Sequence, residues 1–84
     1  MQTKKAVALK YRGQVDAAPR VVAQGAGIIA EAIVRRAREH DVPVHEDDEL
    51  SNALMSVPLG SVIPEELYSV VAEVLAFVYK NKRL

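Results

Sequence analysis

The chain has 84 residues, of which half are hydrophobic, and its 11 basic residues balance its 11 acidic residues. This balance provides no strong field to attract nucleic acid, and no aromatic stacking platform accompanies the basic residues at the two ends, so no nucleic-acid partner is expected. Cysteine is absent, which excludes disulfides, thiolate catalysis and cysteine-ligated metal. A chain of this length is expected to form one small domain over residues 1–84.

No apolar run approaches the roughly 18 to 20 residues that a membrane helix needs. The N-terminus also lacks the apolar segment of a signal peptide. The sequence therefore predicts a cytoplasmic protein.

The first expected element is a strand over residues 6–11. Its period of two places Val7 and Leu9 on one face and Ala8 and Lys10 on the other. A connector over residues 13–19 follows, in which Pro19 favours extended geometry for the residue before it. A short β-branched run predicts a second strand at residues 21–23.

Glycines then precede a helix that is expected to end near His40. Its buried stripe is predicted to contain Ile29, Ile33 and Ala37, with Ala30 and Val34 beside them. The apolar run at residues 42–44 is typical of a strand covered on both sides, and Pro43 indicates either a free edge or a strand that starts at that residue. This run is the third expected strand.

Two more helices are expected in the second half of the chain. Asp47 or Asp48 caps a short helix that ends near Met55. Pro64 starts the last helix, whose apolar residues cover most of its circumference and predict burial on more than one side. The order β-β-α-β-α-α describes a small α/β sandwich, with a sheet of about three strands packed by three helices.

Gly25 and Gly27 fit the dinucleotide-binding pattern G-x-G-x-x-G/A between a strand and a helix. Glu46 lies about 20 residues further on, where such sites carry an acid. The competing interpretation is a turn whose small residues allow close packing, because 84 residues hardly supply the second half of a dinucleotide fold. A nucleotide-binding or small-ligand-binding enzyme subunit is the alternative function.

The acidic segment at residues 45–49, with His40 nearby, contains side chains that bind divalent metals. Its spacing matches no defined metal loop, and a solvated capping turn is the favoured interpretation. No serine stands in the context of a nucleophile elbow. We therefore expect no metal, no cofactor and no enzymatic activity.

Several short segments, in their order and spacing, resemble the C-terminal cytoplasmic domain of the flagellar and virulence type III export switch proteins, the FlhB/YscU family. These segments are residues 6–11, 18–19, 21–25, 42–44, 50–54, 63–64 and 71–76. The resemblance covers nearly the whole chain. It implies a role in protein secretion and flagellum biogenesis, within the export apparatus that switches substrate specificity.

The resemblance fails at the family's self-cleaving tetrapeptide, Asn-Pro-Thr-His. Residues 1–4 read Met-Gln-Thr-Lys, so only Thr3 is kept and the asparagine whose amide attacks the backbone is missing. No self-cleavage is expected, and the chain starts near the position where the family's cleaved fragment starts. Gln24 also stands where the family usually has lysine, and Ser51-Asn52 where it usually has Ala-Arg.

The resemblance implies a small hydrophobic pocket for export substrates at Ala18, Pro19, Ala72 and Leu75. The residue types agree, because Ala18-Pro19 is a stiff extended segment and Ala72 and Leu75 lie three apart on one helix. Ordinary core packing between connector and helix is the competing interpretation.

The expected function is that of a non-enzymatic relative of the cleaved fragment, which binds export substrates and the membrane-bound part of a full-length switch protein. Its location would then be peripheral, at the inner-membrane export gate. The strand that starts at Lys5 would have an unpaired edge for strand addition. A homodimer through that edge is a further possibility.

Overall fold

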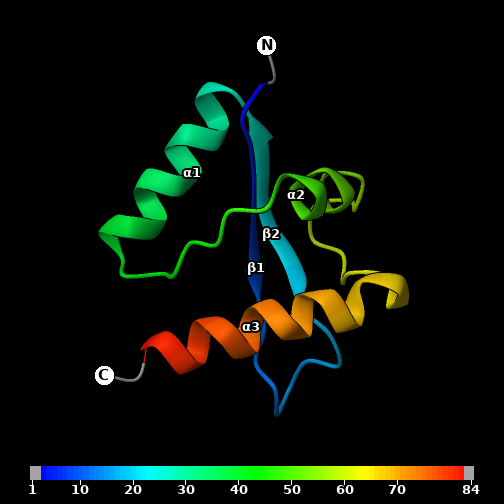
Figure 1. Ribbon diagram of the computed structural model, residues 1–84. Coiled ribbons are helices and arrows are strands. Elements are labelled where there is room, and N and C mark those ends of the chain that lie inside the picture. The colour runs from blue at the N-terminus through cyan, green and yellow to red at the C-terminus, as the bar shows by residue number, and fades with distance from the viewer. Residues whose placement is uncertain (1–2, 83–84) are drawn as a thin grey trace.

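The computed structural model describes residues 3–82. In chain order its elements are strands β1 (Lys5–Lys10) and β2 (Arg20–Ala26), helices α1 (Ile28–Glu39) and α2 (Asp48–Met55), the 3₁₀ turn η1 (Glu65–Leu67) and helix α3 (Tyr68–Lys82) (Figure 1). The predicted α/β class and the three predicted helices are confirmed.

The two strands form an antiparallel hairpin whose register runs from Lys5 opposite Ala26 to Lys10 opposite Arg20. The register shifts once, because Ala8 pairs with Ala23 whereas Leu9 pairs with Val21. Val22 is thus the extra residue of a β-bulge, which increases the local twist of the hairpin.

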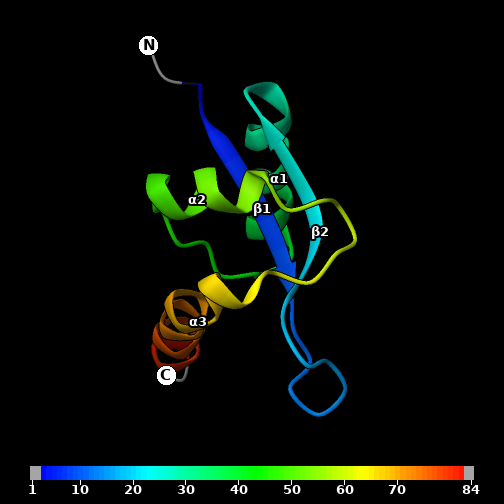
Figure 2. The same ribbon diagram turned by 90° about the vertical axis from the view of Figure 1, so that its right-hand side faces the viewer.

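Helix α1 covers one face of the hairpin and α2 covers the other, while α3 lies across the end at which β1 finishes (Figures 1 and 2). The predicted sidedness of β1 is confirmed. Val7 and Leu9 pack against the core cluster, and the Nζ atom of Lys5, on the same face, donates to Oδ1 of Asn52 in α2 at 2.7 Å. Ala6 is buried on the opposite face.

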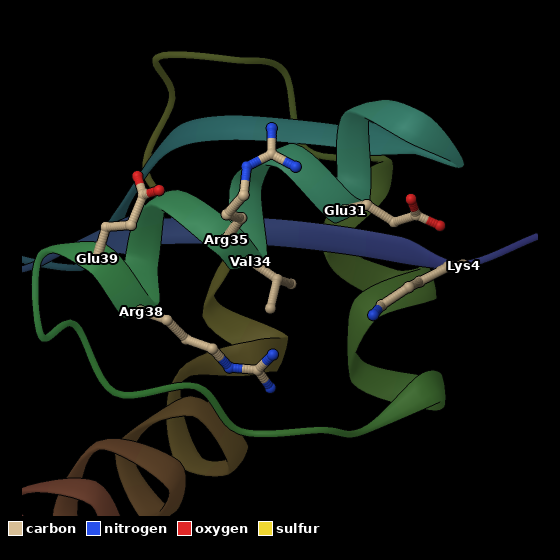
Figure 3. Close-up of a pocket in the computed structure, with 6 residues that line it drawn as sticks. All are labelled: Lys4, Glu31, Val34, Arg35, Arg38 and Glu39. Carbon is tan, nitrogen blue, oxygen red and sulfur yellow. The ribbon is translucent and has the colours of Figure 1, made fainter.

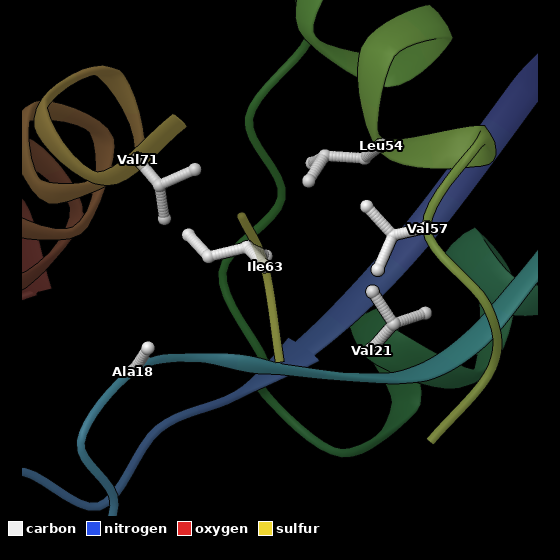
Figure 4. Packing of buried hydrophobic residues seen from close by; sticks show 6 residues of the cluster. All are labelled: Ala18, Val21, Leu54, Val57, Ile63 and Val71. Carbon is white, nitrogen blue, oxygen red and sulfur yellow. The ribbon is translucent and has the colours of Figure 1, made fainter. Parts of the chain in front are cut away.

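The core lies between β2, the C-terminal end of α2, the segment before η1 and the second turn of α3 (Figure 4). Its buried residues are Ala18, Val21, Leu54, Val57, Ile63 and Val71. Each fully buried valine or isoleucine stabilises the fold by about 1.5–3 kcal/mol relative to an exposed side chain. A cluster of six buried residues is a small core, so each of them contributes a large share of the stability of the fold.

The third strand predicted at residues 42–44 is wrong. Asp41 adopts a left-handed conformation with φ of 58°, and Val42 donates its N–H to the carbonyl of Ala37, which turns the chain away from α1. Val42 is then 52% exposed in an extended strap that leads to α2.

The outer edge of β2 is instead covered by residues 60–63. Val21 donates its N–H to Ser61 at 2.9 Å and accepts from Gly60 at 2.8 Å, and Ile63 donates to Pro19 at 2.9 Å. One isolated bridge, between Arg20 and Val62, completes this contact. Within residues 3–82 the sheet proper has two strands.

Helix α1 presents Ala30 to the sheet as its one buried residue, with Ile33, Val34 and Ala37 half-buried along the same stripe. The predicted burial of Ile29 is wrong, since 59% of its surface is exposed. Ala30 is the buried residue of the helix, whereas Ile29 lies at the margin of the contact, with its side chain against Gly25 of β2. The helix ends at Glu39, as expected.

Helix α2 starts as predicted, with Asp47 as its N-cap: Oδ1 of Asp47 accepts from the N–H of Leu50 at 3.0 Å. At the other end, Nε2 of Gln24 donates to the carbonyl of Val57 at 3.0 Å and to that of Leu54 at 3.5 Å. Both ends of this short helix are therefore held by side chains.

Burial of the last helix on more than one side is the third expectation that proves wrong. Over residues 68–80 of α3 only Val71 is fully buried, and Phe77 is 59% exposed. Leu67, Val70 and Leu75 pack against the core from the same side. The aromatic residues Tyr68, Phe77 and Tyr79 are exposed because the core of the described chain lies on one side of the helix.

Candidate functional site

The outer edge of β1 is open. The N–H of Gly27 donates to the carbonyl of Lys4 at 2.7 Å, so the hydrogen-bonded pairs of the antiparallel ladder begin there and recur at every second residue. At the intervening positions, Lys5, Val7 and Leu9, the backbone N–H and C=O groups point away from β2. Among residues 3–82, β1 has no strand partner on that side.

This open edge, which we call the slot, is flanked by one helix on each face of the sheet (Figure 2). Figure 2 shows α2 in front of the sheet and α1 behind it, with β1 as the edge strand between them. Val7 and Leu9 are only half-buried, because their α2-facing sides are covered while the edge itself is uncovered. An extended segment placed here would continue the sheet and stay between the two helices.

The four residues predicted as a substrate pocket meet only in part. Ala18 and Pro19 are buried just before β2, and Ala18 belongs to the core cluster against which Leu75 packs. Ala72 is exposed on α3. The connector and the last helix therefore do come together, with the two residues of the connector inside the fold and Ala72 on the surface.

Two open hollows lie elsewhere on the surface. One, of about 480 Å³, is lined by Lys4 and by α1. The other, of about 620 Å³, lies between the end of α2 and the start of α3. Neither is lined by the four residues predicted as the pocket.

The geometry at Gly25 and Gly27 opposes a phosphate site. Gly25 lies within β2 and is buried, and the space where its side chain would be is filled by Ile29. Gly27, with φ of 61°, uses its N–H to bond Lys4. Glu46 lies in the exposed strap before α2.

The acidic segment before α2 acts as a cap. Asp47 holds the N-terminus of the helix, and the ring of His45 lies edge-on to Phe77 with centroids 6.3 Å apart. Over residues 3–82, no group of three or more histidine, aspartate or glutamate side chains is placed to hold a metal ion. In the same range no helix is long and apolar enough to cross a membrane.

Comparison with known proteins identifies the family to which this fold belongs. Residues 2–78 match the model of the FlhB, HrpN, YscU and SpaS family. The chain belongs to this family. Like the solved C-terminal domains of its members, the chain has an α/β fold with three helices.

The relatives of this FlhB-family chain include proteins of similar and of much greater length. It is 44% identical to the uncharacterized protein YlqH of Bacillus subtilis over 92% of the chain and 83% of YlqH. It is 43% identical to the flagellar biosynthetic protein FlhB of the same organism over 96% of the chain. It spans only 23% of that FlhB.

Solved structures of family members show the same fold. The cytoplasmic domain of FlhB from Shewanella putrefaciens has a TM-score of 0.89 at 36% identity, over 94% of this chain and 62% of that one. The PscU C-terminal domain has a TM-score of 0.82 at 28% identity, over 87% of this chain and 94% of that one.

The departures from the FlhB family pattern lie at distinct places in the fold. Thr3 and Lys4 precede β1 on the surface, and the predicted loss of the family's asparagine and proline concerns residues 1 and 2, outside the described residues. Gln24 bonds the C-terminal carbonyls of α2, a position where a lysine would place its charge at the negative end of the helix. Asn52 accepts the bond from Lys5.

Sequence reasoning missed one feature, the hollow beside α1. Lys4 and Arg38 line it together, although they are far apart in the chain. Lys4 and Arg38 come to the same hollow only because the chain folds back from β1 through β2 into α1. Their spacing in the sequence therefore does not predict that they meet.

Proposed function

We propose that residues 1–84 act as one export-switch C-terminal-like domain in flagellar or type III protein export, as a binding component without enzymatic activity. The open edge of β1 between α1 and α2 carries this proposal, because it is a template for an added strand. The similarity to the cytoplasmic domain of FlhB supports the export setting. The site of action would be the cytoplasmic side of the export gate, at the inner membrane.

The partner at this edge is the membrane-bound part of a full-length switch protein rather than a second copy. Strand β1 reads Lys-Ala-Val-Ala-Leu-Lys, which is almost symmetric. Antiparallel pairing with itself, centred on the outward-facing Val7, would set Lys4 of one copy opposite Lys10 of the other, at both ends of the contact. Like charges directly opposite one another destabilise a strand pair, and lysines on an edge strand discourage self-association.

Complementation tests this proposal. The chain would be produced in cells whose export switch protein is truncated at the cleavage position, and secretion of filament-type subunits would be measured. Restored secretion is expected. If secretion stays absent while the chain is present and folded, the proposal is wrong.

A matched pair of variants tests whether secretion depends on the open edge of β1. Lys5→Pro removes an outward-facing N–H without touching the ladder to β2, whereas Lys5→Ala removes the same side chain and keeps the N–H. Secretion is expected to fall with Lys5→Pro and to persist with Lys5→Ala. A thermal melt of each variant checks that both fold.

Export substrates are proposed to bind at a second place, where the exposed Ala72 and the half-buried Leu75 of α3 adjoin the buried pair Ala18 and Pro19. The packing of Leu75 against the cluster that contains Ala18 supports a common surface there. Ala72→Asp on the exposed side of α3 should weaken capture of an export subunit, while the same change at the exposed Ala53 of α2 should not. Equal capture by both variants would exclude this surface.

A further inference from the structure

The hollow beside α1 adjoins the open edge of β1. It has a volume of about 480 Å³ and is lined by Lys4, Glu31, Val34, Arg35, Arg38 and Glu39. Figure 3 shows Lys4, Val34 and Arg38 directed to the side of β1 that lies away from β2. This is the side to which the unpaired backbone groups of β1 point.

The charged side chains that line the hollow point in different directions. Arg35 and Glu39 point the other way, toward the β2 side, and the carboxylate of Glu31 lies apart from Arg38 at the end of the hollow near Lys4 (Figure 3). In the described part of the chain, neither Lys4 nor Arg38 forms an ion pair; the one ion pair there joins Arg12 and Asp16. Two cations thus face the slot over the apolar side chain of Val34.

The opposite wall of the slot has a different character. Val7 and Leu9 project toward α2 and pack against the core, as does Leu50 of that helix. An added strand has alternating faces, so one set of its side chains would meet this apolar wall and the other set would meet Lys4 and Arg38.

We infer that the segment taken up at the edge of β1 carries carboxylate side chains on its α1-facing side and apolar side chains on its α2-facing side. This inference rests on the proposed strand addition and names the chemistry of the partner. An arginine that faces a slot without an acid of its own binds a carboxylate through two parallel N–H bonds, and Lys4 adds a second positive charge.

Two labelled peptides test the inference on the full chain. One alternates valine with aspartate, and the other replaces each aspartate by asparagine, which has the same shape without the charge. Fluorescence anisotropy measures their affinities. The aspartate peptide is expected to bind more tightly by about two- to fivefold for each carboxylate that is paired, and to lose this preference at high salt.

Variants assign the preference to the hollow. Arg38→Gln and Lys4→Gln should each reduce the preference for aspartate and leave the affinity of the asparagine peptide unchanged. Arg36→Gln is the matched control, because it removes an exposed arginine of the same helix that does not line the hollow. A preference that is equal in Arg38→Gln and in the unchanged protein overturns the inference.

The amide resonances of β1 distinguish the proposal of strand addition from the proposal of a carboxylate preference. Binding of either peptide at the edge should shift the amide resonances of Val7 and Leu9, whose N–H groups face the slot. Shifts with both peptides at equal affinity would keep strand addition and overturn the carboxylate preference. If neither peptide binds, strand addition itself fails, and the inference fails with it.

Discussion

Replacing Gly25 by alanine tests how closely α1 approaches the hairpin. A Cβ atom at this position would lie 2.8 Å from Cβ of Ile29 and would overlap its Cγ2 atom. Overpacking of this kind costs about 1–3 kcal/mol. Because Ile29 is largely exposed and can move outward, we expect Gly25→Ala to cost about 1–2 kcal/mol, in the lower part of that range. In a domain of this size this lowers the melting temperature by about 4–16 °C.

The assay is urea unfolding followed by circular dichroism. The control is Gly13→Ala, since a Cβ at Gly13 would come no closer than 3.5 Å to Tyr11. Alanine there should be neutral or stabilise by up to about 1 kcal/mol through the unfolded state.

The double variant Gly25→Ala/Ile29→Ala should recover most of the lost stability, because the overlapping side chain has been removed. The reasoning is refuted if Gly25→Ala is as stable as the unchanged protein, or if its loss persists in the double variant. Either result would reopen the interpretation of this glycine as part of a ligand-binding turn.

Three further changes test the core and the ends of α2, each by urea unfolding. Ile63→Val should cost about 0.5–1.5 kcal/mol, and the same change at Ile28, which is 85% exposed, should cost less than about 0.5 kcal/mol; equal effects would contradict the assigned core. Asp47→Ala should cost about 0.5–2 kcal/mol through loss of the cap, and Asp48→Ala, which removes no capping bond, should cost less. Gln24→Leu should cost about 1–3 kcal/mol because it removes the donor to the carbonyl of Val57, just after α2, whereas Gln24→Lys keeps a donor and should retain most of the stability. The reverse order would contradict the assigned bonds.

The features that the sequence predicts correctly depend on neighbours in the chain. The alternation of β1 places Val7 and Leu9 on one face whatever the sheet is packed against. The cap at Asp47 likewise depends on the next three residues alone. The small size and cysteine-free composition of the chain leave one modest core as the source of stability.

Contacts between residues far apart in the chain cannot be predicted from local sequence patterns. Residues 42–44 (Val-Pro-Val) and 62–64 (Val-Ile-Pro) are both short apolar runs that include a proline, and either could have covered the edge of β2. The turn at Asp41 and the burial of Ile63 decide in favour of the second run. Which residue of α1 faces the sheet also depends on contact with Gly25, which the helical period alone does not specify.

The candidate site was likewise predictable only in its local features. Among residues 3–82 one edge of β1 is unpaired, and the existence of this strand follows from the sequence. Its surroundings do not, because Lys4 and Arg38 meet only through the folded topology. The apolar residues around α3 suggested burial on more than one side, and the structure leaves many of them exposed.

The three backbone bonds between residues 19–21 and residues 60–63 join the N-terminal half of the chain to the C-terminal half. The amide proton of Val21 is held in one of them, at a residue with no exposed surface. It can exchange with solvent only when the two halves separate. Hydrogen exchange at this single amide would therefore report the cohesion of the whole fold, while the fraying ends of the helices exchange independently of it.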